Sequence, residues 1–83
     1  MYIICMPTIV TYGSFKISII PGDHKPAHVH CVGPDVWVKI EIRTGKVIRN
    51  KGVGSQDVRK LQDEIEKYKD VLLKEWRRYC GEG

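Results

Sequence analysis

The chain has 83 residues, of which 42% are hydrophobic and 29% charged, a composition typical of one small globular domain and not of a disordered segment. We expect a single domain over residues 1–83. The first seven residues have no basic stretch and few apolar side chains, so we expect neither a signal peptide nor a membrane span. The three scattered cysteines Cys5, Cys31 and Cys80 argue against a disulfide framework and indicate a reducing compartment, so we expect a cytoplasmic protein.

The net charge of +4 is unevenly distributed along this small basic protein. Residues 1–54 hold seven Lys/Arg against three Asp/Glu, whereas residues 55–80 hold seven against six. A basic first segment attracts phosphates or an acidic partner. The alternative is an ordinary solvated basic surface.

Residues 6–50 have the pattern of strands. Residues 8–11 form a short β-prone run, and residues 14–19 alternate apolar and polar side chains as a half-buried strand does. The Pro21-Gly22-Asp23 turn precedes a third strand, whose residues Ala27, Val29 and Cys31 share one face.

A β-hairpin is predicted next, and its register can be derived. Proline prefers the second position of a type I turn, so residues 33–36 should form the turn around Pro34. The strand that follows, residues 36–43, has four apolar side chains on one face. Three cross-strand pairs follow from that register: Val32 with Trp37, His30 with Lys39, and His28 with Glu41. Thr44-Gly45 predicts a second tight turn before a strand at 46–49.

Residues 55–80 are predicted to be helical, with Ser55 as the N-cap. Apolar side chains recur there at helical spacing: Val58, Leu61, Ile65, Tyr68, Leu72, Trp76 and Tyr79. A single helix of that length would span ~39 Å, so we expect either a bend near Lys69-Asp70 or an overhang buried in a homodimer. The expected fold is α+β: an antiparallel sheet of four or five strands with one or two C-terminal helices on one face. Trp76 should anchor the helical segment.

All three histidines lie within residues 23–30. His28 and His30 are two apart in a strand, so their side chains project from the same face. Neighbouring strand histidines can chelate one divalent metal ion such as zinc, with Asp23, His24 or Glu41 completing the ligand set.

The polar face of the hairpin offers a second chemistry. It brings together His28, His30, Trp37, Lys39, Glu41 and Arg43. Two imidazoles can divide general-base and general-acid work, with Glu41 orienting His28 and Lys39 or Arg43 stabilising phosphate charge. Trp37 could stack on a base, so this set suits RNA-directed or phosphodiester chemistry. As a functional pair, His28 and His30 lie off the apolar face, and their substitution should affect stability as little as that of surface residues. The remaining alternative is that the histidines are structural, held by hydrogen bonds to the turn and to Glu41, so that their substitution lowers stability.

Four segments together resemble a small bacterial family catalogued as domain of unknown function 4160. They are Met6-Pro7-Thr8-Ile9, Asp23-His24-Lys25-Pro26-Ala27-His28-Val29-His30, Ile40-Glu41-Ile42-Arg43-Thr44-Gly45-Lys46-Val47 and Leu72-Leu73-Lys74-Glu75-Trp76. Members typically start Met-Pro-Thr-Ile and carry Asp-His-x-Pro-Pro-His-Phe-His, so Ala27 and Val29 are departures. The resemblance covers residues 6–78 and implies that residues 1–5 are an N-terminal extension.

The resemblance implies a partner protein, and it carries over no established catalytic residues. Members are often encoded beside another small protein, and such a pair suggests a toxin–antitoxin module. We therefore expect a component of a two-protein module of this kind, with a small partner protein encoded nearby and RNA as a further ligand. The alternatives are a non-catalytic interaction or regulatory module and a small metal-binding protein.

Overall fold

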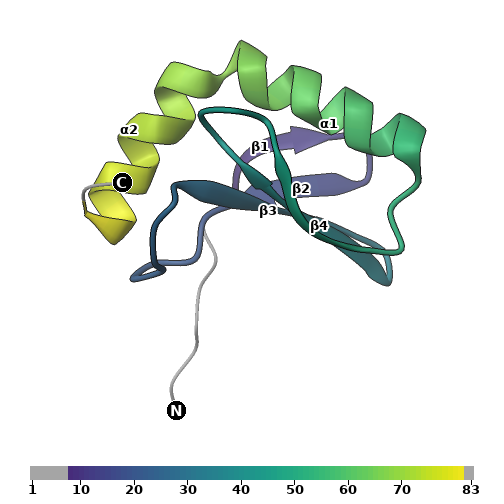
Figure 1. Cartoon of the computed structure of the whole chain (residues 1–83), viewed down its shortest axis with the longest axis horizontal. Helices are drawn as coiled ribbons and strands as arrows, with labels where there is room; N and C mark the ends of the chain where they lie inside the picture. The colour runs from purple at the N-terminus through teal and green to yellow at the C-terminus, as the bar shows by residue number, and fades with distance from the viewer. Residues whose placement is uncertain (1–7, 82–83) are drawn as a thin grey trace.

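A computed structural model describes residues 8–81 as a five-stranded antiparallel sheet followed by two helices (Figure 1). The strands are β1 (Thr8–Tyr12), β2 (Phe15–Ser18), β3 (His28–Gly33), β4 (Val36–Glu41) and β5 (Val47–Lys51), and they lie side by side in chain order. This confirms the expected α+β fold. The expected extension at residues 1–5 lies outside the described residues.

The β3–β4 hairpin has the predicted register. His28 lies opposite Glu41, His30 opposite Lys39 and Val32 opposite Trp37. The expected type I turn is wrong, however, because Asp35 at its third position has φ +61°. A positive φ there belongs to a type II turn, which still accepts proline at the second position.

The helical segment bends, which is the first of the two alternatives expected from the sequence. It forms α1 (Ser55–Lys67) and α2 (Lys69–Cys80), with Tyr68 at φ −107° and ψ 21° between them. The expected Ser55 N-cap is wrong by one residue: Gly54 is the N-cap and makes no side-chain capping bond. Instead, Asn50 exchanges two hydrogen bonds with the backbone of Val53 and shapes the chain before α1.

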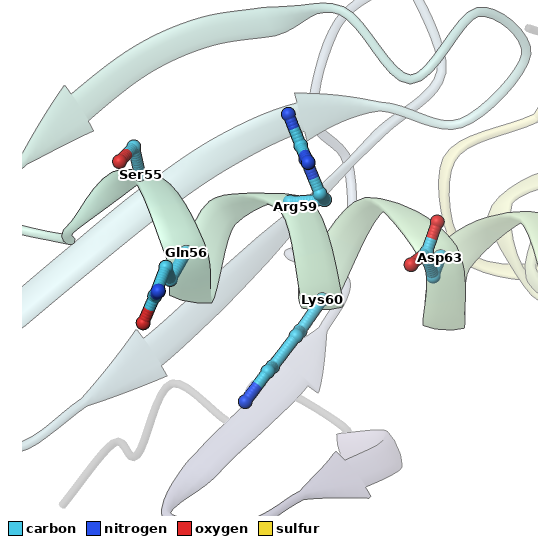
Figure 2. A pocket seen from close by; sticks show the side chains of 5 residues that line it. All are labelled: Ser55, Gln56, Arg59, Lys60 and Asp63. Carbon is cyan, nitrogen blue, oxygen red and sulfur yellow. The ribbon is translucent and has the colours of Figure 1, made fainter.

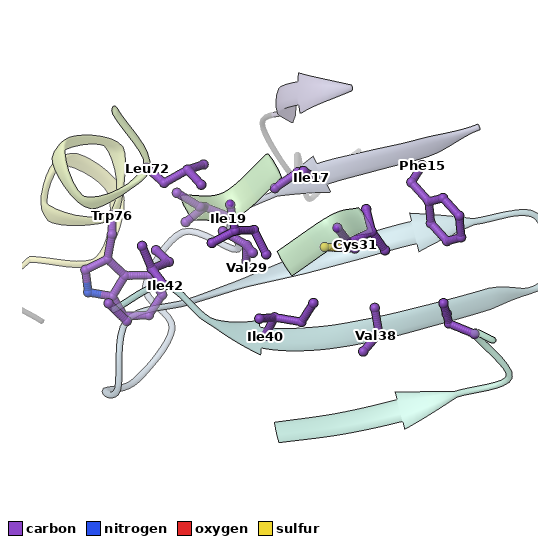
Figure 3. Packing of buried hydrophobic residues seen from close by; sticks show 14 residues of the cluster. Phe15, Ile17, Ile19, Val29, Cys31, Val38, Ile40, Ile42, Leu72 and Trp76 are labelled. Carbon is purple, nitrogen blue, oxygen red and sulfur yellow. The ribbon is translucent and has the colours of Figure 1, made fainter. Parts of the chain in front are cut away.

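Both helices lie on one face of the sheet, and α2 descends past one end of it (Figure 1). The core between the layers contains the apolar side chains of β2, β3 and β4 together with Leu61, Ile65, Leu72 and Trp76. Figure 3 shows Trp76 projecting from α2 beside Ile42 at the end of the sheet. Trp76 is only 1% exposed, which confirms its anchoring position.

Cys31 is fully buried in the same core. Within residues 8–81, neither helix combines the length and the apolarity needed to cross a bilayer.

Candidate functional site

The site begins in the β2–β3 connection, which carries Asp23. The Gly22 backbone N–H donates to the Tyr79 carbonyl oxygen (3.0 Å), and the Cys80 thiol donates to the Ile20 carbonyl oxygen (3.1 Å). The last turn of α2 therefore holds this connection against the end of the sheet. Asp23 is fixed locally as well, because its Oδ1 accepts the His24 backbone N–H at 2.9 Å.

His28 is held at both ring nitrogens. Nδ1 lies 2.7 Å from the Pro26 carbonyl oxygen, and Nε2 lies 2.9 Å from Asp23 Oδ2. A carbonyl oxygen can only accept a hydrogen bond, so Nδ1 carries the hydrogen. In neutral His28 the Nε2 atom then has a lone pair directed at the carboxylate. Two lone pairs repel at this distance, so the contact is a hydrogen bond only when Nε2 also carries a proton. A metal ion bound by both atoms would take the place of that proton.

His30 completes a three-residue cluster. Its Nε2 lies 3.4 Å from the same Asp23 Oδ2, and its ring is edge-on to that of His28 with the centroids 5.2 Å apart. One ligand atom from each of Asp23, His28 and His30 lies within 4.8 Å of the others. The cluster could hold a metal ion.

Electrostatics place Asp23 and His30 in the protonation states that a metal needs. Burial opposes ionisation of Asp23, but hydrogen bonds from the His24 backbone and from the two imidazoles outweigh it, so the pKa lies below its usual 3.8. Burial also lowers the pKa of His30 below 6.5. The hydrogen bond to Asp23 opposes this shift, whereas the positive charges of His28 and Lys39 act in the same direction as burial. At neutral pH the pair therefore offers an anionic carboxylate and a neutral imidazole, the forms that ligate metals.

The expectation that both histidines behave as surface residues is wrong for His28. This side chain alternates onto the face away from the helices, yet the residue is only 5% exposed. Trp76 explains the difference, because α2 passes the end of the sheet and brings the indole within 5.1 Å of the His28 ring, centroid to centroid. No local sequence signal relates two residues so far apart in the chain.

Glu41 and Lys39 lie opposite the two histidines on β4 but are not among the three residues of the cluster. Glu41 pairs with His28 in the register, but its Oε1 accepts from the Thr44 hydroxyl at 2.8 Å, and Asp23 is the carboxylate that contacts His28. Lys39 lies opposite His30.

Three candidates lie outside the cluster. The His24 backbone N–H donates to Asp23, but the side chain of His24 is exposed. Arg43 is also exposed, and Trp37 is half-buried in β4, two residues before Lys39.

A separate shallow depression lies along α1 (Figure 2). It is lined by Ser55, Gln56, Arg59, Lys60 and Asp63. All five residues are exposed and none belongs to the histidine cluster. Its mixed charges indicate an ordinary solvated helix surface.

Comparison with known proteins identifies a family and gives no assigned activity. No curated protein and no solved structure matches the chain. The model of the family described as domain of unknown function (DUF4160) matches residues 14–77. That segment is well over half of the chain and includes the whole histidine cluster. The resemblance noted in the sequence is therefore confirmed, and the chain belongs to the DUF4160 family.

Proposed function

We propose that this protein binds a divalent transition-metal ion, with zinc as the first choice, through Asp23 Oδ2, His28 Nε2 and His30 Nε2. The contact between His28 and Asp23 is the observation that carries the proposal. Since the Pro26 carbonyl accepts from Nδ1, His28 Nε2 faces the Asp23 carboxylate, and the two atoms can share a proton or bind a metal ion in its place. Metal-ligating histidines commonly donate their other ring N–H to a carbonyl in this way.

The ligand set indicates which ions fit. Imidazole nitrogens suit Zn²⁺, Fe²⁺ and Cu²⁺, whereas Mg²⁺ and Ca²⁺ prefer all-oxygen sites. Three protein ligands also leave positions for water or a substrate, as in catalytic centres and unlike closed structural zinc sites. The arrangement therefore supports a metal centre with exchangeable positions.

Calorimetric titration with Zn²⁺ tests the proposal, with Co²⁺ absorption as a second measurement. We expect one ion per chain, and at least about tenfold weaker binding in His30→Ala. His24→Ala is the matched control, because it removes a histidine of the same segment whose ring lies outside the cluster. Thermal melts of each variant show whether the fold is retained.

Two results would contradict the metal site. One is the absence of stoichiometric binding in the parent protein. The other is an equal loss of affinity in the His24 and His30 variants, which would indicate adventitious binding to exposed histidines.

We also propose a second role, as the component of a toxin–antitoxin-like module that binds a small partner protein. Strand β5 supports this role, because it lies at the edge of the sheet and four of its five residues are exposed. An edge strand offers unpaired backbone groups to a strand of another chain. Ile48 in β5 is 43% exposed and gives such a contact an apolar anchor.

Copurification with the protein encoded beside this gene tests the second role. Ile48→Asp should prevent the complex, whereas Val71→Asp should not, since Val71 is similarly exposed (48%) but lies on α2. An equal loss in both variants would contradict a β5 interface. A homodimer seen by size-exclusion chromatography, abolished by Ile48→Asp, would assign the edge to a second copy instead.

A further inference from the structure

The charges of the sheet are segregated by face. All four Lys and Arg residues of the strands project from the face opposite the helices: Lys16, Lys39, Arg49 and Lys51. We call this surface the open face. The strands contain a single acidic residue, Glu41 at the end of β4, and its carboxylate already accepts from Thr44. A second carboxylate, that of Asp23, contacts His30 from the β2–β3 connection. The helices carry nearly balanced charge, with six acids against seven Lys and Arg residues.

The strand register arranges the open face in two adjacent rows. One row crosses four strands and consists of Lys16, Val32, Trp37 and Lys51. The next consists of Ser18, His30, Lys39 and Arg49. Neighbouring strands lie ~4.8 Å apart, so Lys16 and Lys51 are separated by ~14 Å with the indole of Trp37 between them. Within residues 8–81, both helices pack on the opposite face (Figure 1). On the open face Lys16, Arg49 and Lys51 are exposed, whereas Ser18 and His28 are buried.

We propose that the open face binds a single-stranded nucleic acid, with a base stacked on Trp37 and phosphates paired with Lys16, Lys39, Arg49 and Lys51. Proteins that bind single strands combine aromatic platforms with basic surfaces that follow the backbone. An acidic protein partner would account for the cations but not for an aromatic residue set among them. A duplex fits less well, because no helix or ribbon of residues 8–81 projects from this face to enter a groove.

Fluorescence anisotropy with a short labelled uridine oligonucleotide tests the proposal, in EDTA so that a metal cannot bridge the phosphates. We expect the double variant Lys16→Gln/Lys51→Gln to weaken binding about tenfold or more. The slope of log K against log salt should fall by ~1.4, as expected for two lost phosphate contacts to a single strand. Arg59→Gln/Lys60→Gln is the matched control: it removes the same charge from exposed positions of α1 and should change affinity much less.

Trp37→Leu tests the stacking contact without adding or removing charge. We expect about fivefold or greater weakening with an unchanged salt slope, and recovery in Trp37→Phe. Melting curves identify any variant that loses its fold, and the lysine variants test the proposal independently of Trp37.

Three results would overturn the proposal. Equal losses of affinity in Lys16→Gln/Lys51→Gln and in Arg59→Gln/Lys60→Gln would show that binding depends only on the net charge of the protein. If duplex DNA of matched length bound as tightly as the single strand, no unpaired base would be needed for binding, which would contradict stacking on Trp37. Competition by polyglutamate as effective as that by unlabelled oligonucleotide would point to an acidic protein. The same oligonucleotide in deoxy form should bind comparably, because neither row presents a group selective for the 2′-hydroxyl.

Discussion

Replacing Trp76 by alanine should remove much of the stability of this small domain. The residue is 1% exposed and lies between the core and the histidine cluster, beside Ile42 and with its ring 5.1 Å from that of His28 (Figure 3). Truncating an enclosed tryptophan costs ~3–5 kcal/mol. A domain of this size has a free energy of unfolding of ~4–12 kcal/mol, so a large fraction of it would be lost.

Thermal melts followed by circular dichroism measure the effect. Each kcal/mol corresponds to ~4–8 °C in a domain of this length, so Trp76→Ala should lower Tm by at least ~12 °C. The same variant should bind Zn²⁺ more weakly than the parent at a temperature where it remains folded, because it removes the indole that packs against His28.

Trp76→Phe separates packing from hydrogen bonding. The Nε1 atom of Trp76 is buried and has no hydrogen-bond partner within residues 8–81. Phenylalanine removes this unsatisfied donor, which offsets part of the lost ring contact. We expect less than half the destabilisation of the alanine variant. An alanine variant that melts within ~2 °C of the parent, or a phenylalanine variant as unstable as the alanine variant, would refute the reasoning.

Three further predictions concern the fold. Burial raises the pKa of the Cys31 thiol from 9.0 to about 12, so the unfolded chain loses this proton at a lower pH than the folded protein, and stability falls as the pH rises above 9. Over pH 9–10.5 the free energy of unfolding of Cys31→Ala should therefore fall less steeply than that of the parent protein, and equal slopes would contradict this. Asn50→Ala removes both hydrogen bonds to the backbone before α1, each 2.9 Å long, and should cost ~1–3 kcal/mol in urea unfolding; a loss under ~0.5 kcal/mol would argue against the contact. Gly33→Ala would place a Cβ 2.8 Å from Phe15 Cε1 and should cost ~1–3 kcal/mol, whereas Gly54→Ala meets nothing within 4 Å; the idea fails if both variants melt alike.

Local periodicity was sufficient to predict the sheet and the face on which the histidines lie. Alternation with a period of two assigns each side chain of β3 and β4 to one face, and a slip by one residue would expose the apolar set. The register of His28 with Glu41 and of His30 with Lys39 follows from that constraint. The length of the helical segment left two alternatives, a break or an overhang buried in a dimer, since one continuous helix would extend beyond the sheet. The structure shows the break between α1 and α2.

The composition of the site was decided by tertiary structure. Sequence reasoning offered Asp23, His24 and Glu41 as partners of the histidines, and only the path of the β2–β3 connection brings Asp23 to both rings. That path depends on hydrogen bonds to the last turn of α2, far along the chain.

The burial of His28 has the same origin, because the indole of Trp76 reaches it from α2. Periodicity specifies the direction of a side chain relative to its own strand. Which distant segment then covers that side chain depends on how the layers pack, and no local pattern contains that information.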